Sequence, residues 1–181
     1  ATPGAAARLR PGDPVGVSLI RGDFDFSATG TVTEVDGDRV YAFGHPFFGL
    51  GPTQFPMTKA YIHTILPSLM SSSKMASGGE VIGTIQQDRA TAIAGRLGSG
   101  PPMIPITLSL ASERAPTRRF ELSVVNDQLF TPLLAYVSIL NTLTSYERQN
   151  GAASYVVKGS AMVKKYGAVN FEDLFTGDTP S

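Results

Sequence analysis

His45 is the residue whose type and surroundings are best suited to chemistry. It stands between Gly44 and Pro46, and Gly49 and Gly51 follow a few residues later. Pro46 disfavours the α conformation at His45 and ends the preceding strand. Because imidazole titrates near neutral pH, a histidine displayed at a strand end can act as a general base toward a hydroxyl nucleophile. The alternative is an ordinary loop histidine that hydrogen-bonds a neighbouring carbonyl.

A histidine base of this kind works with a carboxylate that orients it. Asp88 is the most interesting candidate for an orienting carboxylate, because it lies in the polar segment 86–89 between apolar strands. Its alternative role is a structural ion pair with Arg89. The other aspartates considered are Asp25, Asp36, Asp38 and Asp127, of which Asp36 and Asp38 are explained by a turn.

The chain shows no competent nucleophile of its own. Ser71, Ser72 and Ser73 lack the flanking glycines that expose a catalytic serine and help to build an oxyanion hole. Ser99 lies between two glycines, but two prolines follow, so a turn explains it. The sequence alone therefore offers a base without a partner to activate.

His63, the second histidine, lies in the middle of a predicted strand. We expect a half-buried structural side chain there rather than a ligand. The spacing of the two histidines matches no known metal motif, and there is no cysteine. The sequence therefore predicts no metal and no cofactor.

The composition indicates a folded, tightly packed chain of 181 residues, 42% of them hydrophobic and 17% charged. The 15 basic and 15 acidic side chains balance, so nothing favours a nucleic acid or an anionic membrane as partner. No apolar run approaches the length of a membrane span. The absence of cysteine excludes disulfides and thiol catalysis, and it is compatible with an extracytoplasmic location.

Short alternating runs separated by turn signals predict a mainly β fold. A hairpin is expected at Asp36-Gly37 and a bulge at Gly30. Pro56 indicates that its strand begins at a sheet edge, and Gly78-Gly79 is expected to break the chain. The expected strands cover 15–20, 24–35, 39–43, 55–66, 80–86, 89–97, 103–110, 118–125 and 153–164, with 103–110 and 118–125 forming a pair.

One long helix is expected near the C-terminus. Thr131 is the predicted N-cap, Pro132 occupies the first helical position, and Gly151 is a natural stop. Glu172-Asp173 in the tail predicts one helical turn. These elements favour an antiparallel β-barrel with a helix packed against it. The expected organisation is a flexible lead-in over 1–12, a single β-rich domain over 13–176 and a frayed tail over 177–181.

Two sequence segments resemble the stage IV sporulation protein B family of serine peptidases. The first contains Ala28-Thr-Gly-Thr-Val-Thr and Ala42-Phe-Gly-His-Pro46, and the latter matches the histidine motif of that family. The second runs from Gly79-Glu-Val-Ile-Gly-Thr-Ile to Ile93-Ala-Gly-Arg-Leu97. The resemblance covers residues from about 13 to 110. It implies a trypsin-like or related barrel, a serine peptidase activity and His45 as the base.

The resemblance is incomplete, because the Gly-Met-Ser-Gly-Ser-Pro-like motif that carries the nucleophile of the family does not occur in residues 1–181. In many secreted relatives that motif lies upstream of the histidine segment. The chain begins at Ala1 without a methionine, which indicates a processed fragment or a cloned piece. The serine is then expected in an upstream segment of the same precursor, now a separate associated chain; the alternatives are that the serine part was lost or that this member is non-catalytic.

Two functions remain open at this stage. The first is the histidine-bearing part of a secreted, bacterial, extracytoplasmic peptidase-like domain that is inactive alone and acts on peptides. The second is a non-catalytic β-barrel module for binding or self-assembly. Edge strands such as 55–66 suit the second function, since they can pair with another chain.

Overall fold

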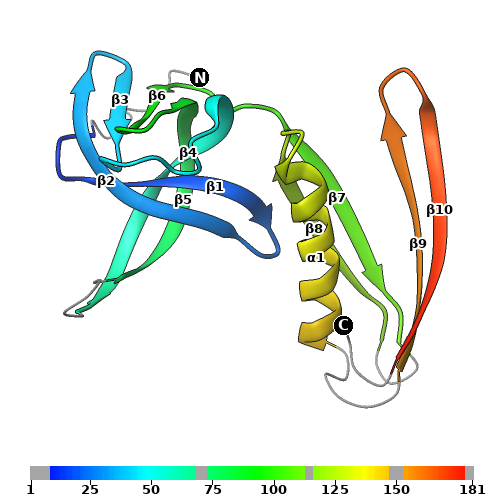
Figure 1. Cartoon of the computed structure of the whole chain (residues 1–181). Coiled ribbons are helices and arrows are strands. Elements are labelled where there is room, and N and C mark those ends of the chain that lie inside the picture. Colours follow the sequence, from blue (N-terminus) through cyan, green and yellow to red (C-terminus); the bar gives the residue numbers. More distant parts are fainter. Residues whose placement is uncertain (1–8, 68–72, 113–115, 147–152, 178–181) are drawn as a thin grey trace, which may run out of the picture. The chain divides into compact units, whose positions relative to one another are not determined.

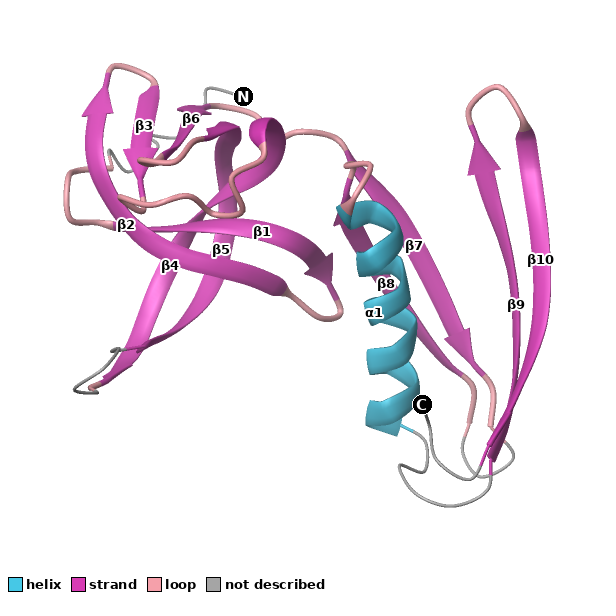
Figure 2. Cartoon of the chain, in the orientation of Figure 1, coloured by secondary structure: helices cyan, strands magenta, loops and turns pink. Residues whose placement is uncertain are grey.

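The structure is a computed structural model that describes residues 9–67, 73–112, 116–146 and 153–177. As expected, the chain is mainly β, its strands pair antiparallel, and one helix lies near the C-terminal end of the described residues (Figures 1 and 2). Within the described residues, no helix is long and apolar enough to cross a membrane.

Contacts between residues divide the chain into two compact units. The first unit comprises Ala1–Ser109 and Arg118–Tyr136, and the second comprises Leu110–Thr117 and Val137–Ser181. Compact units do not by themselves decide whether a chain folds as one domain. The predicted domain boundaries of 13–176 therefore stay a prediction.

Ten strands and one helix follow one another in the described chain, mostly where alternation and turn residues place them. The two strands predicted at 103–110 and 118–125 have those bounds and are neighbours in the sheet. The elements are β1 Pro14–Gly22, β2 Phe26–Asp36, β3 Arg39–Ala42, β4 Gly51–Leu66, β5 Ser73–Asp88, β6 Ile93–Leu97, β7 Met103–Leu110, β8 Arg118–Val125, α1 Phe130–Tyr146, β9 Ala153–Val163 and β10 Gly167–Gly177.

The first eight strands form one sheet in the order β2-β3-β6-β5-β4-β1-β8-β7. In addition, β1 pairs with β2, from Pro14 opposite Thr31 to Ile20 opposite Phe26. The hairpin between β2 and β3 turns between Asp36 and Arg39, as predicted. β9 and β10 pair only with each other, in a separate two-stranded sheet.

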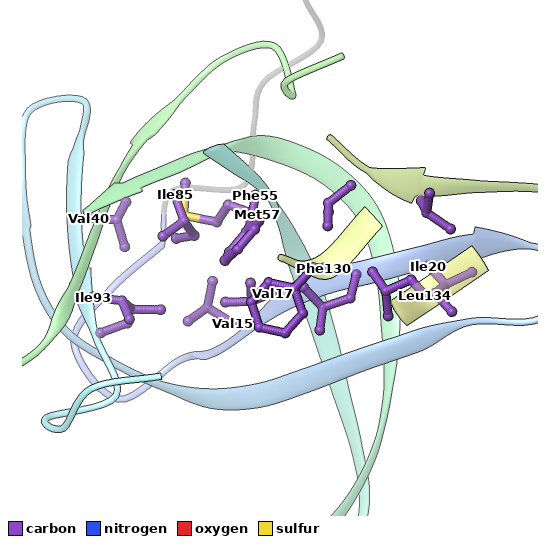
Figure 3. Packing of buried hydrophobic residues seen from close by; sticks show 14 of the residues in the cluster. Val15, Val17, Ile20, Val40, Phe55, Met57, Ile85, Ile93, Phe130 and Leu134 are labelled. Atoms are coloured by element: carbon purple, nitrogen blue, oxygen red, sulfur yellow. The ribbon is translucent and has the colours of Figure 1, made fainter. Parts of the chain in front are cut away.

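The hydrophobic core of the first unit gathers apolar side chains from these strands, most of them β-branched, leucine or aromatic. Two residues of the first turns of α1, Phe130 and Leu134, belong to the same cluster. Figure 3 shows Val15, Val17, Val40, Phe55, Met57, Ile85, Ile93 and Phe130 converging on it. This packing fixes the strand ends from which the candidate site emerges.

The helix begins differently from the prediction. Asp127, not Thr131, acts as the cap: its Oδ1 accepts hydrogen bonds from the N–H groups of Leu129 and Phe130, at 2.9 and 3.0 Å. The Thr131 hydroxyl donates to the carbonyl of Val125 at 2.8 Å instead. The predicted helix stop at Gly151 lies outside the described residues.

Three predictions about strands are wrong. β4 is not an edge strand, because it lies between β5 and β1; at Pro56 it pairs with β5 alone, since the β1 ladder includes only Met57–Lys59 of this strand. Gly78-Gly79 does not interrupt the extended structure but lies inside β5. The tail forms β10 rather than a helical turn, because it pairs with β9 along its whole length.

The predicted bulge at Gly30 is also wrong. The β1–β2 register is continuous around Gly30 and shifts only between Ser18 and Ile20. What Gly30 provides is space: a Cβ atom there would lie 2.1 Å from the ring of Phe43. Glycine is needed at this position because the Phe43 ring lies against the backbone.

Gly83 of β5 offers a test of the packing. A Cβ atom at Gly83 would lie 2.0 Å from the carbonyl oxygen of Arg96, a backbone atom that cannot move aside alone. We predict that Gly83→Ala lowers the free energy of unfolding by about 1–3 kcal/mol, measured by urea denaturation. The matched control is Gly78→Ala in the same strand, where the nearest atom is 3.4 Å away. Equal stability of the two variants would contradict the packing described for β5.

Candidate functional site

The loop between β3 and β4 carries His45, and its backbone is unusual from its first residue. Phe43 has φ of 75°, a region that bulky side chains rarely adopt, and Gly44 follows with φ of 74°. The Phe43 N–H donates to the carbonyl of Thr31 at 2.9 Å. With its ring seated over Gly30, Phe43 is therefore held at both its backbone and its side chain.

The imidazole of His45 is exposed to solvent. Its Nδ1 lies 2.7 Å from the carbonyl oxygen of Pro46. A carbonyl oxygen only accepts hydrogen bonds, so in this contact Nδ1 carries the proton, and in the neutral ring Nε2 is the unprotonated nitrogen. The ring thus makes the carbonyl contact expected of an ordinary loop histidine, and the same contact leaves Nε2 free to accept a proton.

Asp88 lies at the end of β5 and is 1% exposed. Its Oδ1 accepts a hydrogen bond from the Phe47 N–H at 2.7 Å, and its Oδ2 accepts from the N–H groups of Phe48 and Leu50 at 2.8 and 3.2 Å. The carboxylate therefore binds the loop immediately after His45. Its contacts are to the backbone rather than to the imidazole.

The ion pair considered between Asp88 and Arg89 is not present among the salt bridges of the described residues. Three N–H donors satisfy the buried carboxylate in place of a cation, which is how a buried anion avoids a large desolvation cost. The role predicted for Asp88, orientation of the imidazole, stays a prediction at this point.

Aromatic rings continue from the imidazole into the core. The centroid of the Phe43 ring lies 5.6 Å from that of His45, and Phe47 lies 5.9 Å from Phe43. Phe48 packs on Phe47 at 4.2 Å and on Phe130 at 4.8 Å, yet it stays 52% exposed. The loop is thus packed through a cluster of aromatic rings, and the Phe48 ring of this cluster is half exposed to solvent.

The other aspartates considered have separate roles. Asp38 forms a salt bridge with Arg96 at 2.9 Å on the surface, Asp127 caps α1, and Asp25 and Asp36 are exposed. Among the serines considered, Ser71 and Ser72 lie outside the described residues, as does the side chain of Ser73. Ser99 lies in the loop after β6, where its carbonyl accepts a hydrogen bond from Thr84 at 2.9 Å.

His63 is exposed, so the expectation of a half-buried side chain is wrong. Its Nε2 lies 2.9 Å from Oγ of Ser77 on the neighbouring strand β5. Sequence reasoning missed this pair, because only the bulged register of β4 against β5 brings the two residues together. A hydroxyl–imidazole contact is the geometry of a nucleophile and its base, but the hydrogen bonds of the described residues supply nothing that orients His63.

Lys59 lies on the same pair of strands and forms a salt bridge with Glu80. The hydrogen bond that Lys59 donates to Glu80 raises the pKa of Lys59 above its ordinary value, with smaller electrostatic contributions from Glu80 and Tyr61 opposing desolvation. Lys59 therefore stays protonated at neutral pH and does not act as a base. Within the described ranges, no group of three or more acidic or histidine side chains is arranged to hold a metal ion.

A scan against protein-family models finds no match for this chain, and searches of curated proteins and of solved structures find none either.

The loop anchor gives a stability prediction. We expect Asp88→Ala to lower the free energy of unfolding by about 2–4 kcal/mol, because three loop N–H groups lose their acceptor. The matched control is Asp38→Ala, which removes an exposed salt bridge worth less than about 1 kcal/mol. Both can be measured by chemical denaturation. If Asp88→Ala cost no more than Asp38→Ala, the carboxylate would not be the anchor of this loop.

Proposed function

We propose that this chain is the histidine-bearing part of an extracytoplasmic serine-peptidase-like domain, and that His45 is its general base. The nucleophilic serine comes from a segment outside these 181 residues, so the chain alone is inactive. The observation that carries the proposal is the exposed imidazole of His45, whose Nδ1 bonds the Pro46 carbonyl and whose Nε2 is left as the proton acceptor.

In the proposed peptide hydrolysis, this chain contributes the His45 imidazole and the Pro46 carbonyl. Nε2 takes the proton from the serine hydroxyl as its oxygen attacks the carbonyl carbon of a peptide bond, and the imidazolium then gives that proton to the leaving amine. The Pro46 carbonyl holds Nδ1–H throughout. This fixes one tautomer, which is a task that a carboxylate performs in a catalytic triad.

The strand pairings support the fold part of the proposal. From β1 they lead through β2, β3, β6, β5 and β4 back to β1. We propose that these six strands form a small closed antiparallel barrel related to those of trypsin-like peptidases. The absence of cysteine is compatible with the proposed extracytoplasmic location.

A fluorophosphonate probe, which labels activated serines, tests the proposal on the full-length gene product. We predict labelling of one serine outside residues 1–181, and a labelling rate that falls by about 10²–10⁴-fold in the His45→Ala variant. The control is His63→Ala, which removes the other imidazole and should leave the rate unchanged.

The same probe applied to the 181-residue chain alone should label nothing. Labelling at Ser77 would identify Ser77, with His63 as its base, as the nucleophile. It would overturn the proposal that His45 is the base and that the serine lies outside this chain. An unlabelled full-length protein, or a His45→Ala variant labelled at the wild-type rate, would remove the peptidase proposal altogether.

A second candidate function is a non-catalytic binding or self-assembly module, and the β9–β10 sheet favours it. Partner residues along this sheet share a face. One face is mainly apolar and contains Tyr155, Val157, Ala161, Val163, Val169, Phe171 and Phe175, with Asp173 as its charged residue; the opposite face carries the Lys158–Glu172 salt bridge. Phe171 and Phe175 are 50% and 53% exposed. A two-stranded sheet is marginally stable alone in water, so a second copy that covers the apolar face would stabilise it.

Light scattering tests this second function. If the apolar face joins two copies, Val169→Lys should convert an oligomer into a monomer, because it places a charge in the contact. Met162→Lys is the matched control: Met162 is 81% exposed and lies on the opposite face, so this variant should stay oligomeric. A monomeric wild-type chain, or equal behaviour of the two variants, would contradict self-assembly through this face.

A further inference from the structure

We propose that Asp88 is a positioning residue for His45 and acts through a single peptide group. The carboxylate binds one side of the Pro46–Phe47 peptide, and the imidazole binds the other side. This inference rests on the proposed role of His45 as a base. It assigns to Asp88 the orienting function that a triad carboxylate performs by direct contact.

The geometry of the peptide group makes the connection. A trans peptide bond is planar, and its N–H and C=O point in opposite directions. The Phe47 N–H donates to Oδ1 of Asp88 at 2.7 Å, so the Pro46 carbonyl of the same group points away from Asp88. On that side it accepts the Nδ1–H of His45, also at 2.7 Å.

The resulting relay runs from the carboxylate through the peptide group to the imidazole. Hydrogen bonds in such a chain polarise one another, so an anion at the N–H makes the carbonyl a stronger acceptor. The buried position of Asp88, 1% exposed, limits screening of its charge by water. Asp88 thereby both fixes the plane of the peptide and strengthens its hold on Nδ1–H.

The other two contacts of Asp88 keep the relay in place. The Phe48 and Leu50 N–H groups bind Oδ2, so they fix the carboxylate without touching the peptide group that meets the imidazole. At the other end of the loop, Phe43 is held by Thr31 and Gly30. The relay and the anchor can therefore be separated by experiment.

Long-range ¹H–¹⁵N NMR spectra of the imidazole, recorded on the intact chain with the ring neutral, report the tautomer of His45. We expect an Nδ1–H to Nε2–H ratio of about ten or more in the wild type, since a hydrogen bond of ordinary strength fixes one form. In Asp88→Asn the ratio should fall several-fold toward the Nε2–H form. Asp88→Glu, which keeps the charge, should restore part of it, and Asp38→Asn should change nothing.

A second pair of variants covers the case in which Asp88→Asn does not fold. Replacing the Phe47 residue by phenyllactate turns its amide into an ester, which removes the N–H of the relay and also makes the Pro46 carbonyl a weaker acceptor. The same replacement at Phe48 removes an anchor of Asp88 only. In the Phe47 ester the relay is already interrupted, so adding Asp88→Asn should lower the ratio no further. The ratio should fall for the ester at Phe47 and stay at the wild-type value for the ester at Phe48.

The readout distinguishes a relay from an anchor. A fall for both esters would make Asp88 an anchor alone, and an unchanged ratio in Asp88→Asn or in the Phe47 ester would overturn the relay. A wild-type ring that favours Nε2–H would overturn it as well. None of these outcomes depends on a nucleophile, so they are separate from the fluorophosphonate test of the proposed function.

Discussion

The buried carboxylate of Asp88 is the interaction on which the candidate site depends. Asp88 ends β5, where it lies opposite Gly51 of β4 and Ile93 of β6. The sheet thus places the anion below the loop that joins β3 to β4. A charge that is 1% exposed is tolerated only when hydrogen bonds replace its water, and the N–H groups of the loop provide them. The loop and the carboxylate consequently require each other.

The backbone of the loop shows the same mutual dependence. Phe43 adopts φ of 75°, which costs of the order of 1–3 kcal/mol and persists only because surrounding contacts offset that cost. Its ring packs over Gly30 and its N–H bonds Thr31, so β2 determines the start of the loop. β5 determines its end through Asp88. His45 lies between these two fixed points, Phe43 and the residues bound by Asp88. Its side chain is exposed to solvent on a segment that is itself fixed, as a catalytic group needs to be.

Much of the fold could be predicted from the sequence, because local patterns carried it. Alternation and turn signals placed β7 and β8, and Asp36-Gly37 placed the β2–β3 hairpin. The tail was assigned to a helical turn because Glu172-Asp173 suits one locally, whereas pairing with β9 decided its structure. The capping residue was misplaced for a related reason: both Asp127 and Thr131 suit a helix start, and only the hydrogen bonds distinguish them.

Long-range register explains what the sequence did not reveal about the site. His45 and Asp88 could each be singled out from their neighbours, but the peptide group that links them depends on β5 ending below the loop. The contact between His63 and Ser77 likewise depends on several shifts of register between β4 and β5. Such shifts leave no periodic signal, because each one moves the following side chains to the other face.

Amide hydrogen exchange of the loop tests the central claim most directly. Phe48 is exposed and Phe47 and Leu50 are partly exposed, so in a mobile loop their N–H groups would exchange almost as fast as in an unfolded chain. If Asp88 holds the loop, these three N–H groups should be protected to the same degree as the β4–β5 ladder. Exchange of all three at the rate of a free loop would contradict the account.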